Sequence, residues 1–314
     1  MRVREACDSD HYPAQSGAGG GAAGPRLDEG TQLVGLRWYP DAGEASAFVV
    51  GGGRDREQER EDLAVNGPRS PEDRSRMDAD NRARTARRAR GRLRRYVVAN
   101  ALVRMASLTY SPTVGTSSPD CGQPDAEAAE REAVHQAGGD GRCVACGRPV
   151  GGLGLAATMR DAAGFVRRLR GILGVESIAY AVVPEHHEDG HVHAHVLLDR
   201  YVAKAVLARA WGHGFVDVRK FRGRGGREAA RKAAAYAGKY VAKSFDQDQG
   251  GRHRYEVAEG YQPEVVKRGG FRSLEDAVDF VLDHGQRVVY GVHSDAIDGY
   301  DGPAFLFVSL EAAA

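Results

Sequence analysis

The chain has 314 residues, of which 42% are hydrophobic and 28% charged, a composition typical of a globular protein with a buried core. It contains neither a run of 18 apolar residues nor a basic-then-apolar leader, so we expect a cytoplasmic protein without a membrane partner. The net charge of +1 conceals two basic blocks: residues 81–110 carry nine arginines and no acid, and residues 201–245 carry 11 Lys and Arg against two acids. Such blocks indicate a surface that binds a polyanion.

Residues 1–80 are predicted to be a low-complexity, mostly disordered N-terminal region. Acids outnumber bases by 16 to 10 there, and the tract "QSGAGGGAAG" is flexible in composition. Within it, "TQLVGLRWYP" is compatible with one short strand. From 81 to 100, apolar residues recur at three- and four-residue steps with arginines between them, which predicts an amphipathic helix. A strand is expected next, over 101–112, ending at Pro112.

Residues 111–150 are predicted to be an insertion, because Ser, Pro, Gly and acids interrupt the regular pattern. The insertion contains one C-x-x-C pair, which is a weak signal for structural Zn²⁺. A four-ligand site would use Cys121, His135, Cys143 and Cys146. Free thiols are the alternative.

The remaining chain alternates short periodic segments. We expect a helix over 159–173, a strand at 177–185, its hairpin partner at 191–198, a helix at 202–211, a strand at 214–221 and a helix at 227–243. Residues 250–314 are predicted to form a C-terminal α/β extension with a helix at 273–285 and two strands. This order predicts an α+β fold in which residues 81–249 form a central antiparallel sheet with helices on one face.

The strand "HVHAHVLL" contains the first candidate site. Side chains alternate along a strand, so His193 and His195 share one face, and the hairpin returns Glu185 opposite them. Two imidazoles and a carboxylate can hold a divalent cation while leaving positions open for water and a phosphate oxygen. A pair formed by His191 and His193 fits as well, with His187 as a further candidate.

The segment "AAAYAGKYVAKSF" contains the second candidate site, because Tyr236, Lys239 and Tyr240 share one helical face. A phenol has an ordinary pKa near 10 and becomes a nucleophile only when a cation or base stabilises its anion. Attack on a DNA phosphodiester would leave a 5′-phosphotyrosine and a free 3′-hydroxyl. A metal ion nearby would polarise the phosphate.

Three segments, "RMASLTYSP", "EHHEDGHVHAHVLL" and "YAGKYVAK", resemble in this order the three motifs of the HUH endonucleases. Within that family the likeness is in particular to rolling-circle replication initiators of actinobacterial plasmids and integrative elements. The resemblance implies an HUH, palm-like nicking domain with Mg²⁺ or Mn²⁺ held by His193, His195 and Glu185. It also implies Tyr236 as the nucleophile, Tyr240 as a second tyrosine and Lys239 between them. Ala194 departs from the family, which usually has a bulky residue there.

The resemblance predicts a replication initiator that binds a double-strand origin and nicks one strand of DNA. The chain has no G-x-x-x-x-G-K-[ST] motif, so a host helicase is expected as a partner. DNA contacts are assigned to Arg87, Arg88, Arg94, Arg95, Arg219, Lys220, Arg222 and Arg224. Two alternatives stay open: a two-tyrosine transposase of the same superfamily, in which the cysteines would be a shared feature, and a non-catalytic DNA-binding repressor.

Overall fold

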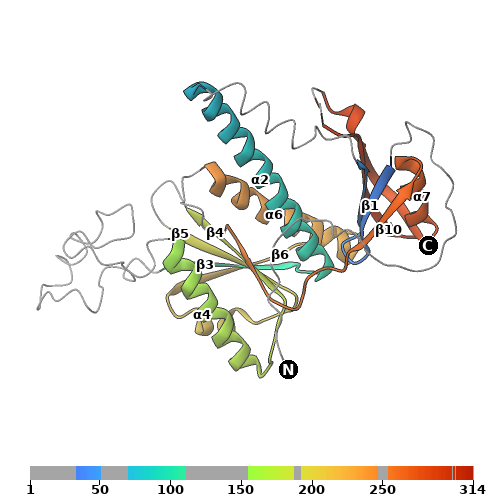
Figure 1. Ribbon diagram of the computed structural model, residues 1–314. Coiled ribbons are helices and arrows are strands. Elements are labelled where there is room, and N and C mark those ends of the chain that lie inside the picture. Colours follow the sequence, from blue (N-terminus) through green and yellow to red (C-terminus); the bar gives the residue numbers. More distant parts are fainter. Residues whose placement is uncertain are drawn as a thin grey trace, which may run out of the picture.

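The computed structural model describes residues 33–50, 70–110, 155–186, 192–246 and 254–313 except 299 and 301. These residues form two five-stranded antiparallel sheets and five α-helices (Figure 1). The predicted α+β class is confirmed. Within the described residues, no helix has the length and apolar character needed to cross a membrane.

The first sheet contains the predicted histidine strand at its centre, and all of its strands run antiparallel to their neighbours. In spatial order its strands are β6 (Gly214–Lys220), β3 (Arg104–Tyr110), β5 (Val192–Leu198), β4 (Tyr180–His186) and β7 (Glu256–Val257). β4 and β5 pair as the expected hairpin, which sets Glu185 directly opposite His193.

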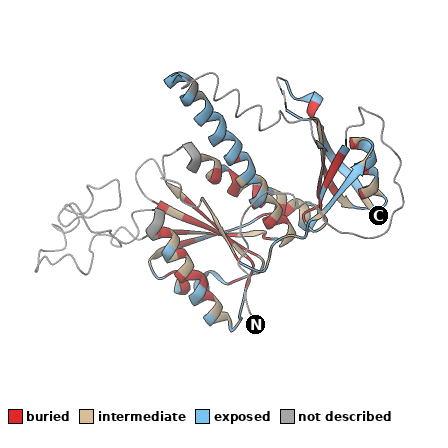
Figure 2. Ribbon diagram, in the orientation of Figure 1, coloured by how far each residue is buried: buried red, intermediate tan, exposed pale blue. Residues whose placement is uncertain are grey.

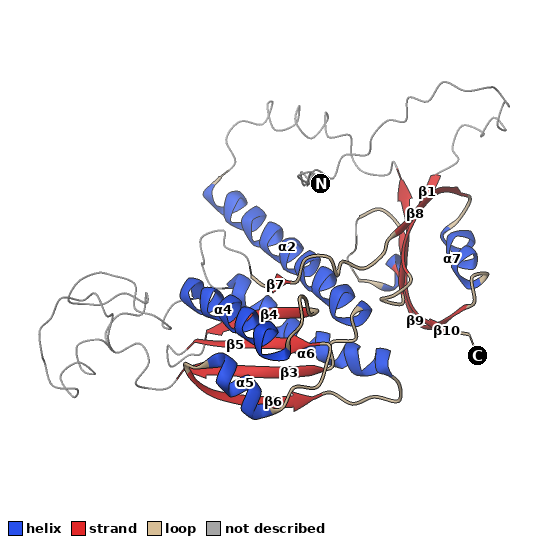
Figure 3. Ribbon diagram, turned by 90° about the horizontal axis from the view of Figure 1, so that it is seen from below, coloured by secondary structure: helices blue, strands red, loops and turns tan. Residues whose placement is uncertain are grey.

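Helices cover both faces of this sheet, whereas the sequence predicted helices on one face only. α4 (Leu155–Leu173) and α5 (Lys204–Trp211) pack on one face, and α2 (Pro71–Ala99) and α6 (Gly226–Asp246) pack on the other (Figure 3). The central strands show why: Val196 belongs to the core under α4 and α5, and Leu197 to the core under α2 and α6. A strand buried on both faces reads as continuously apolar, which hides the second layer from a sequence pattern.

The second sheet joins the two ends of the described chain. In spatial order its strands are β8 (Val266–Phe271), β1 (Leu33–Tyr39), β2 (Glu44–Val50), β10 (Phe305–Ala312) and β9 (Gln286–His293). α7 (Leu274–Leu282) covers one face, and the 3₁₀ helix η1 (Ser294–Ala296) follows β9. The C-terminal extension is therefore completed by an N-terminal hairpin.

Two expectations about the N-terminal region are corrected by this sheet. Residues 33–50 are ordered strands, because Val34, Leu36 and Trp38 alternate inward and pack in the core beneath α7. Their partners β8 and β10 lie more than 200 residues further along the chain, which no local pattern can show. The helix expected from residue 81 begins instead at Pro71.

Arginines fasten the second sheet to α2 and α6. Arg94 of α2 makes two contacts of 2.6 and 3.0 Å with the carboxylate of Glu44, whose side chain is 3% exposed. Arg227 and Arg231 of α6 donate to the backbone carbonyls of Pro40, Gly43 and Leu310. The connection between the two sheets is thus polar and uses cations from the basic blocks.

Candidate active site

The histidine strand presents its imidazoles to α6. His193 and His195 lie on the face of β5 that α2 and α6 cover, while Ala194 between them is fully buried toward α4 and α5. The small side chain of Ala194 therefore meets the opposite core and takes no part in the site. His195 itself is only 5% exposed. The alternative residues His187 and His191 lie outside the described residues.

Two hydroxyls from the neighbouring strand β3 fix these rings. Ser107 Oγ lies 3.0 Å from His195 Nδ1, and Thr109 Oγ1 lies 3.0 Å from His193 Nδ1. Both pairs follow from the β3–β5 register, which sets Ser107 opposite His195 and Thr109 opposite His193. A partner at Nδ1 orients the ring and leaves Nε2 as the atom that can bind a ligand. The sequence reading missed both hydroxyls as site residues, although their two-residue spacing matches that of the histidines.

Glu185 contacts one of the two histidines. Its Oε2 lies 2.9 Å from His195 Nε2, and its Oε1 lies 3.6 Å from Lys243 Nζ. The Glu185 side chain is 10% exposed, so the carboxylate is largely shielded from water. Lys243 of α6 was not assigned from the sequence, and it supplies a counter-charge to this carboxylate.

The predicted metal ligands are brought together only in part. His193 faces Glu185 across the hairpin, but within the described part of the chain no group of three or more His, Cys, Asp and Glu side chains is arranged to hold a metal ion. The assembled pair has suitable spacing, because two adjacent ligands of an octahedral cation at about 2.1 Å lie roughly 3 Å apart. Imidazole nitrogen and carboxylate oxygen also suit a divalent cation such as Mg²⁺ or Mn²⁺.

The tyrosine helix lies directly over the histidines. The ring of Tyr240 stacks on His195 with centroids 4.2 Å apart and planes 21° from parallel. Tyr236, one turn earlier on α6, meets Tyr240 edge to face at 5.4 Å and 74°. The helical spacing and the strand spacing thus place both phenols on the same side of the sheet as His195 and Glu185.

The two phenols have different surroundings. Arg219 lies over the Tyr236 ring at 4.7 Å from its centroid, and Lys239 lies over it at 5.6 Å. Tyr240 lies deeper: burial, a hydrogen bond with Tyr236 and the charge of Glu185 raise its pKa well above the ordinary value of 10. Tyr236 therefore has positive charge beside it, and Tyr240 is kept as the neutral phenol.

The residues assigned to DNA contacts fall into two groups. Five are exposed and lie on α2, on β6 or just after β6, where phosphates could reach them (Figure 2): Arg87, Arg88, Lys220, Arg222 and Arg224. Arg94, Arg95 and Arg219 are engaged within the protein, by Glu44, by the ring of Tyr39 and by the ring of Tyr236 respectively.

The candidate zinc residues Cys121, His135, Cys143 and Cys146 lie outside the described residues, so the zinc prediction stays a prediction.

Residues 155–245 match a family model described as replication-associated protein of the ORF2 type. The matched segment runs from α4 to α6 and contains Glu185, His193, His195 and both tyrosines. This match supports a replication initiator. No curated protein and no solved structure matches the chain.

Proposed function

We propose that this chain is a replication initiator that nicks one strand of DNA at a double-strand origin through Tyr236. The product would be a 5′-phosphotyrosine and a 3′-hydroxyl from which rolling-circle replication starts. The observation that carries the proposal is the stack of Tyr240 on His195, with Glu185 bound to that imidazole and Tyr236 against Tyr240. A host helicase would unwind the duplex, since the sequence contains no P-loop motif.

In the proposed step, the phenol oxygen of Tyr236 attacks the phosphorus of a phosphodiester and loses its proton to solvent. The bond from phosphorus to the 3′-oxygen breaks, and that oxygen takes up a proton to become the 3′-hydroxyl. Negative charge develops on the phosphate oxygens during this displacement. Arg219 and Lys239, which already lie over the Tyr236 ring, supply positive charge next to the reacting atoms.

His193, His195 and Glu185 would hold Mg²⁺ or Mn²⁺, which when bound polarises the phosphate. Ser107 and Thr109 hold the two imidazoles with Nε2 available, and Lys243 balances the charge of Glu185.

Tyr240 is proposed as the second tyrosine, which acts after Tyr236 has been consumed. Its raised pKa keeps it protonated during the first transfer, so the two phenols do not compete. Once Tyr236 is esterified, Tyr240 is the phenol that remains on the same helix face.

The test is covalent capture of DNA. Single-stranded oligonucleotides that tile the DNA flanking the gene, labelled at the 3′ end, are incubated with the chain and Mn²⁺ and resolved on a denaturing gel. We expect a labelled protein band that disappears with EDTA and with Tyr236→Phe, and that persists with Tyr240→Phe because the first transfer does not need the second phenol. Absence of a band with every divalent metal would favour the repressor, and a band that survives Tyr236→Phe would exclude Tyr236 as the nucleophile.

A further inference from the structure

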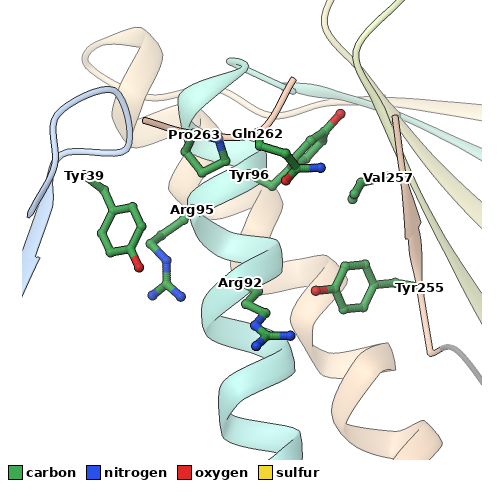
Figure 4. A pocket seen from close by; sticks show the side chains of 8 residues that line it. All are labelled: Tyr39, Arg92, Arg95, Tyr96, Tyr255, Val257, Gln262 and Pro263. Atoms are coloured by element: carbon green, nitrogen blue, oxygen red, sulfur yellow. The ribbon is translucent and has the colours of Figure 1, made fainter. Parts of the chain in front are cut away.

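A cavity of about 250 Å³ lies between α2, the end of β1 and the segment around β7. Its walls include Tyr39, Arg92, Arg95, Tyr255 and Gln262, and Figure 4 shows the two guanidinium groups between the rings of Tyr39 and Tyr255. The second sheet supplies Tyr39, and α2 supplies both arginines. None of these residues takes part in the candidate active site.

The cavity has unbalanced positive charge. Two arginines line it, and no Asp or Glu is among its lining residues. The carboxylate near Arg95 is that of Glu44, 3.9 Å away, and Arg94 already holds it at 2.6 Å. Arg92 is exposed and makes no ion pair with the described residues. The charges therefore suit an anionic ligand.

Aromatic rings complete the cavity. The Arg95 guanidinium lies 4.5 Å from the centroid of the Tyr39 ring. Burial raises the pKa of Tyr255, and the nearby charges of Arg92 and Arg95 oppose that shift, which shows that both cations are close to this phenol as well. Phenol rings beside guanidinium groups are the combination that binds nucleotides, with a base stacked on a ring and a phosphate on the cations.

The position of the cavity links it to the active site. Tyr96 and Val257 of its wall and the site tyrosines Tyr236 and Tyr240 belong to or pack on one hydrophobic core, beneath α2 and α6. Both sites thus lie on the same face of the first sheet. A volume just below the roughly 300 Å³ at which ordinary small-ligand pockets begin accommodates a single nucleotide and excludes a base pair.

We propose that this cavity binds one nucleotide of a single-stranded DNA segment, with its phosphate on Arg92 and Arg95 and its base stacked on Tyr39 or Tyr255. This inference rests on the proposed function for the identity of the nucleic acid. It adds a second anchor for the strand, formed where the second sheet meets α2.

The experiment measures binding apart from nicking. The full chain carrying Tyr236→Phe is titrated in EDTA against a fluorescent 20-nucleotide single strand of mixed sequence, and anisotropy reports the affinity. Two matched pairs isolate the cavity: Tyr39→Leu against Tyr39→Phe, and Arg92→Gln against Arg84→Gln, an exposed arginine on the same helix outside the cavity.

Loss of a stacking ring is expected to weaken binding by about 5- to 150-fold, so Tyr39→Leu should fall in this range and Tyr39→Phe within about twofold of the parent. Arg92→Gln should weaken binding roughly tenfold and Arg84→Gln no more than about twofold. Thermal unfolding at the parent temperature shows that the variants are folded.

Parental affinity in both Tyr39→Leu and Arg92→Gln would overturn the proposal. It would also fall if a deoxynucleoside 5′-monophosphate competed at the same concentration as the 20-nucleotide strand, because the ligand would then be a free nucleotide. If the cavity variants lose binding as expected while the wild-type chain forms no covalent adduct, the cavity stands and the proposed nicking function fails.

Discussion

The two sheets of this protein have the same number of strands and the same antiparallel pairing, yet only the first contains the candidate active site. Helices enclose the first sheet on both faces, so His195 is 5% exposed and must be paired within the protein. The second sheet has α7 on one face, and on its described open face Arg37, Phe48 and Tyr290 are at least partly exposed. Enclosure between two helical layers, rather than the sheet itself, is what allows imidazoles to be held in fixed orientations.

The buried polar groups of the two sheets also serve different ends. In the first sheet Ser107, His195 and Glu185 form a connected row under Tyr240. In the second sheet the buried Glu44 binds Arg94 and so attaches the sheet to α2. We infer that one sheet carries the chemistry while the other positions α2, and matched substitutions in the two sheets should separate these roles.

The largest effect is expected for His195→Ala, compared with His293→Ala in the second sheet. Loss of the His195 imidazole removes a proposed metal ligand, and since a metal contributes several kcal/mol to the transition state, adduct formation should fall about 1,000-fold. His293 is partly exposed and far from the tyrosines along the chain, so its removal should leave the adduct rate near the parent value. Single-turnover rates in Mn²⁺ make this comparison, and equal rates for the two variants would break the proposed division between the sheets.

Arg94→Ala should cost stability rather than chemistry. It leaves the carboxylate of Glu44 buried without its bidentate partner, and such a loss lowers the free energy of unfolding by about 3 kcal/mol. The matched variant Arg287→Ala breaks the exposed pair with Glu311 and should cost less than about 1 kcal/mol. Urea unfolding measures both, and a value for Arg94→Ala as small as that for Arg287→Ala would show that the pair does not fasten the sheet.

Ser107→Ala tests the hydroxyl that orients His195. Residues that position a metal ligand typically contribute 10- to 100-fold to metal affinity or activity, so the adduct rate should fall by about that factor and recover in part at high Mn²⁺. Ser46→Ala, on a strand of the second sheet, is the control and should leave the rate unchanged. A loss in Ser107→Ala that no Mn²⁺ concentration relieves would contradict a positioning role.

The smallest effect is expected for Arg222→Gln, which removes one exposed cation after β6. If Arg222 contacts a phosphate, the slope of log affinity against log salt should decrease in magnitude by roughly 0.7 for single-stranded DNA. The salt titration of Arg287→Gln, from the second sheet, should keep the parent slope. Identical slopes for both variants would remove Arg222 from the DNA surface.

Local patterns in the sequence predicted most elements and one contact of the site. The β4–β5 hairpin is short, so the approach of Glu185 to the histidine strand followed from spacing alone. The face shared by Tyr236 and Tyr240 likewise followed from helical periodicity.

What the sequence could not show depends on partners that are distant in the chain. Ser107 reaches His195 across 88 residues, and the neighbours of β2 and β8 in the second sheet include strands from the opposite end of the chain. Arg94 was assigned to DNA because its block contains no acid, but its carboxylate partner lies 50 residues earlier. Charge counted within a window does not reveal an ion pair formed outside it.

The most direct measurement of the central claim is to locate the covalent nucleotide on the protein. Trypsin cleaves after Lys232, Lys239 and Lys243, so Tyr236 and Tyr240 fall in separate peptides, 233–239 and 240–243. Mass spectrometry of the nuclease-trimmed adduct is predicted to find the phosphonucleotide on peptide 233–239. A nucleotide attached to a tyrosine outside α6, or to no tyrosine, would contradict the account.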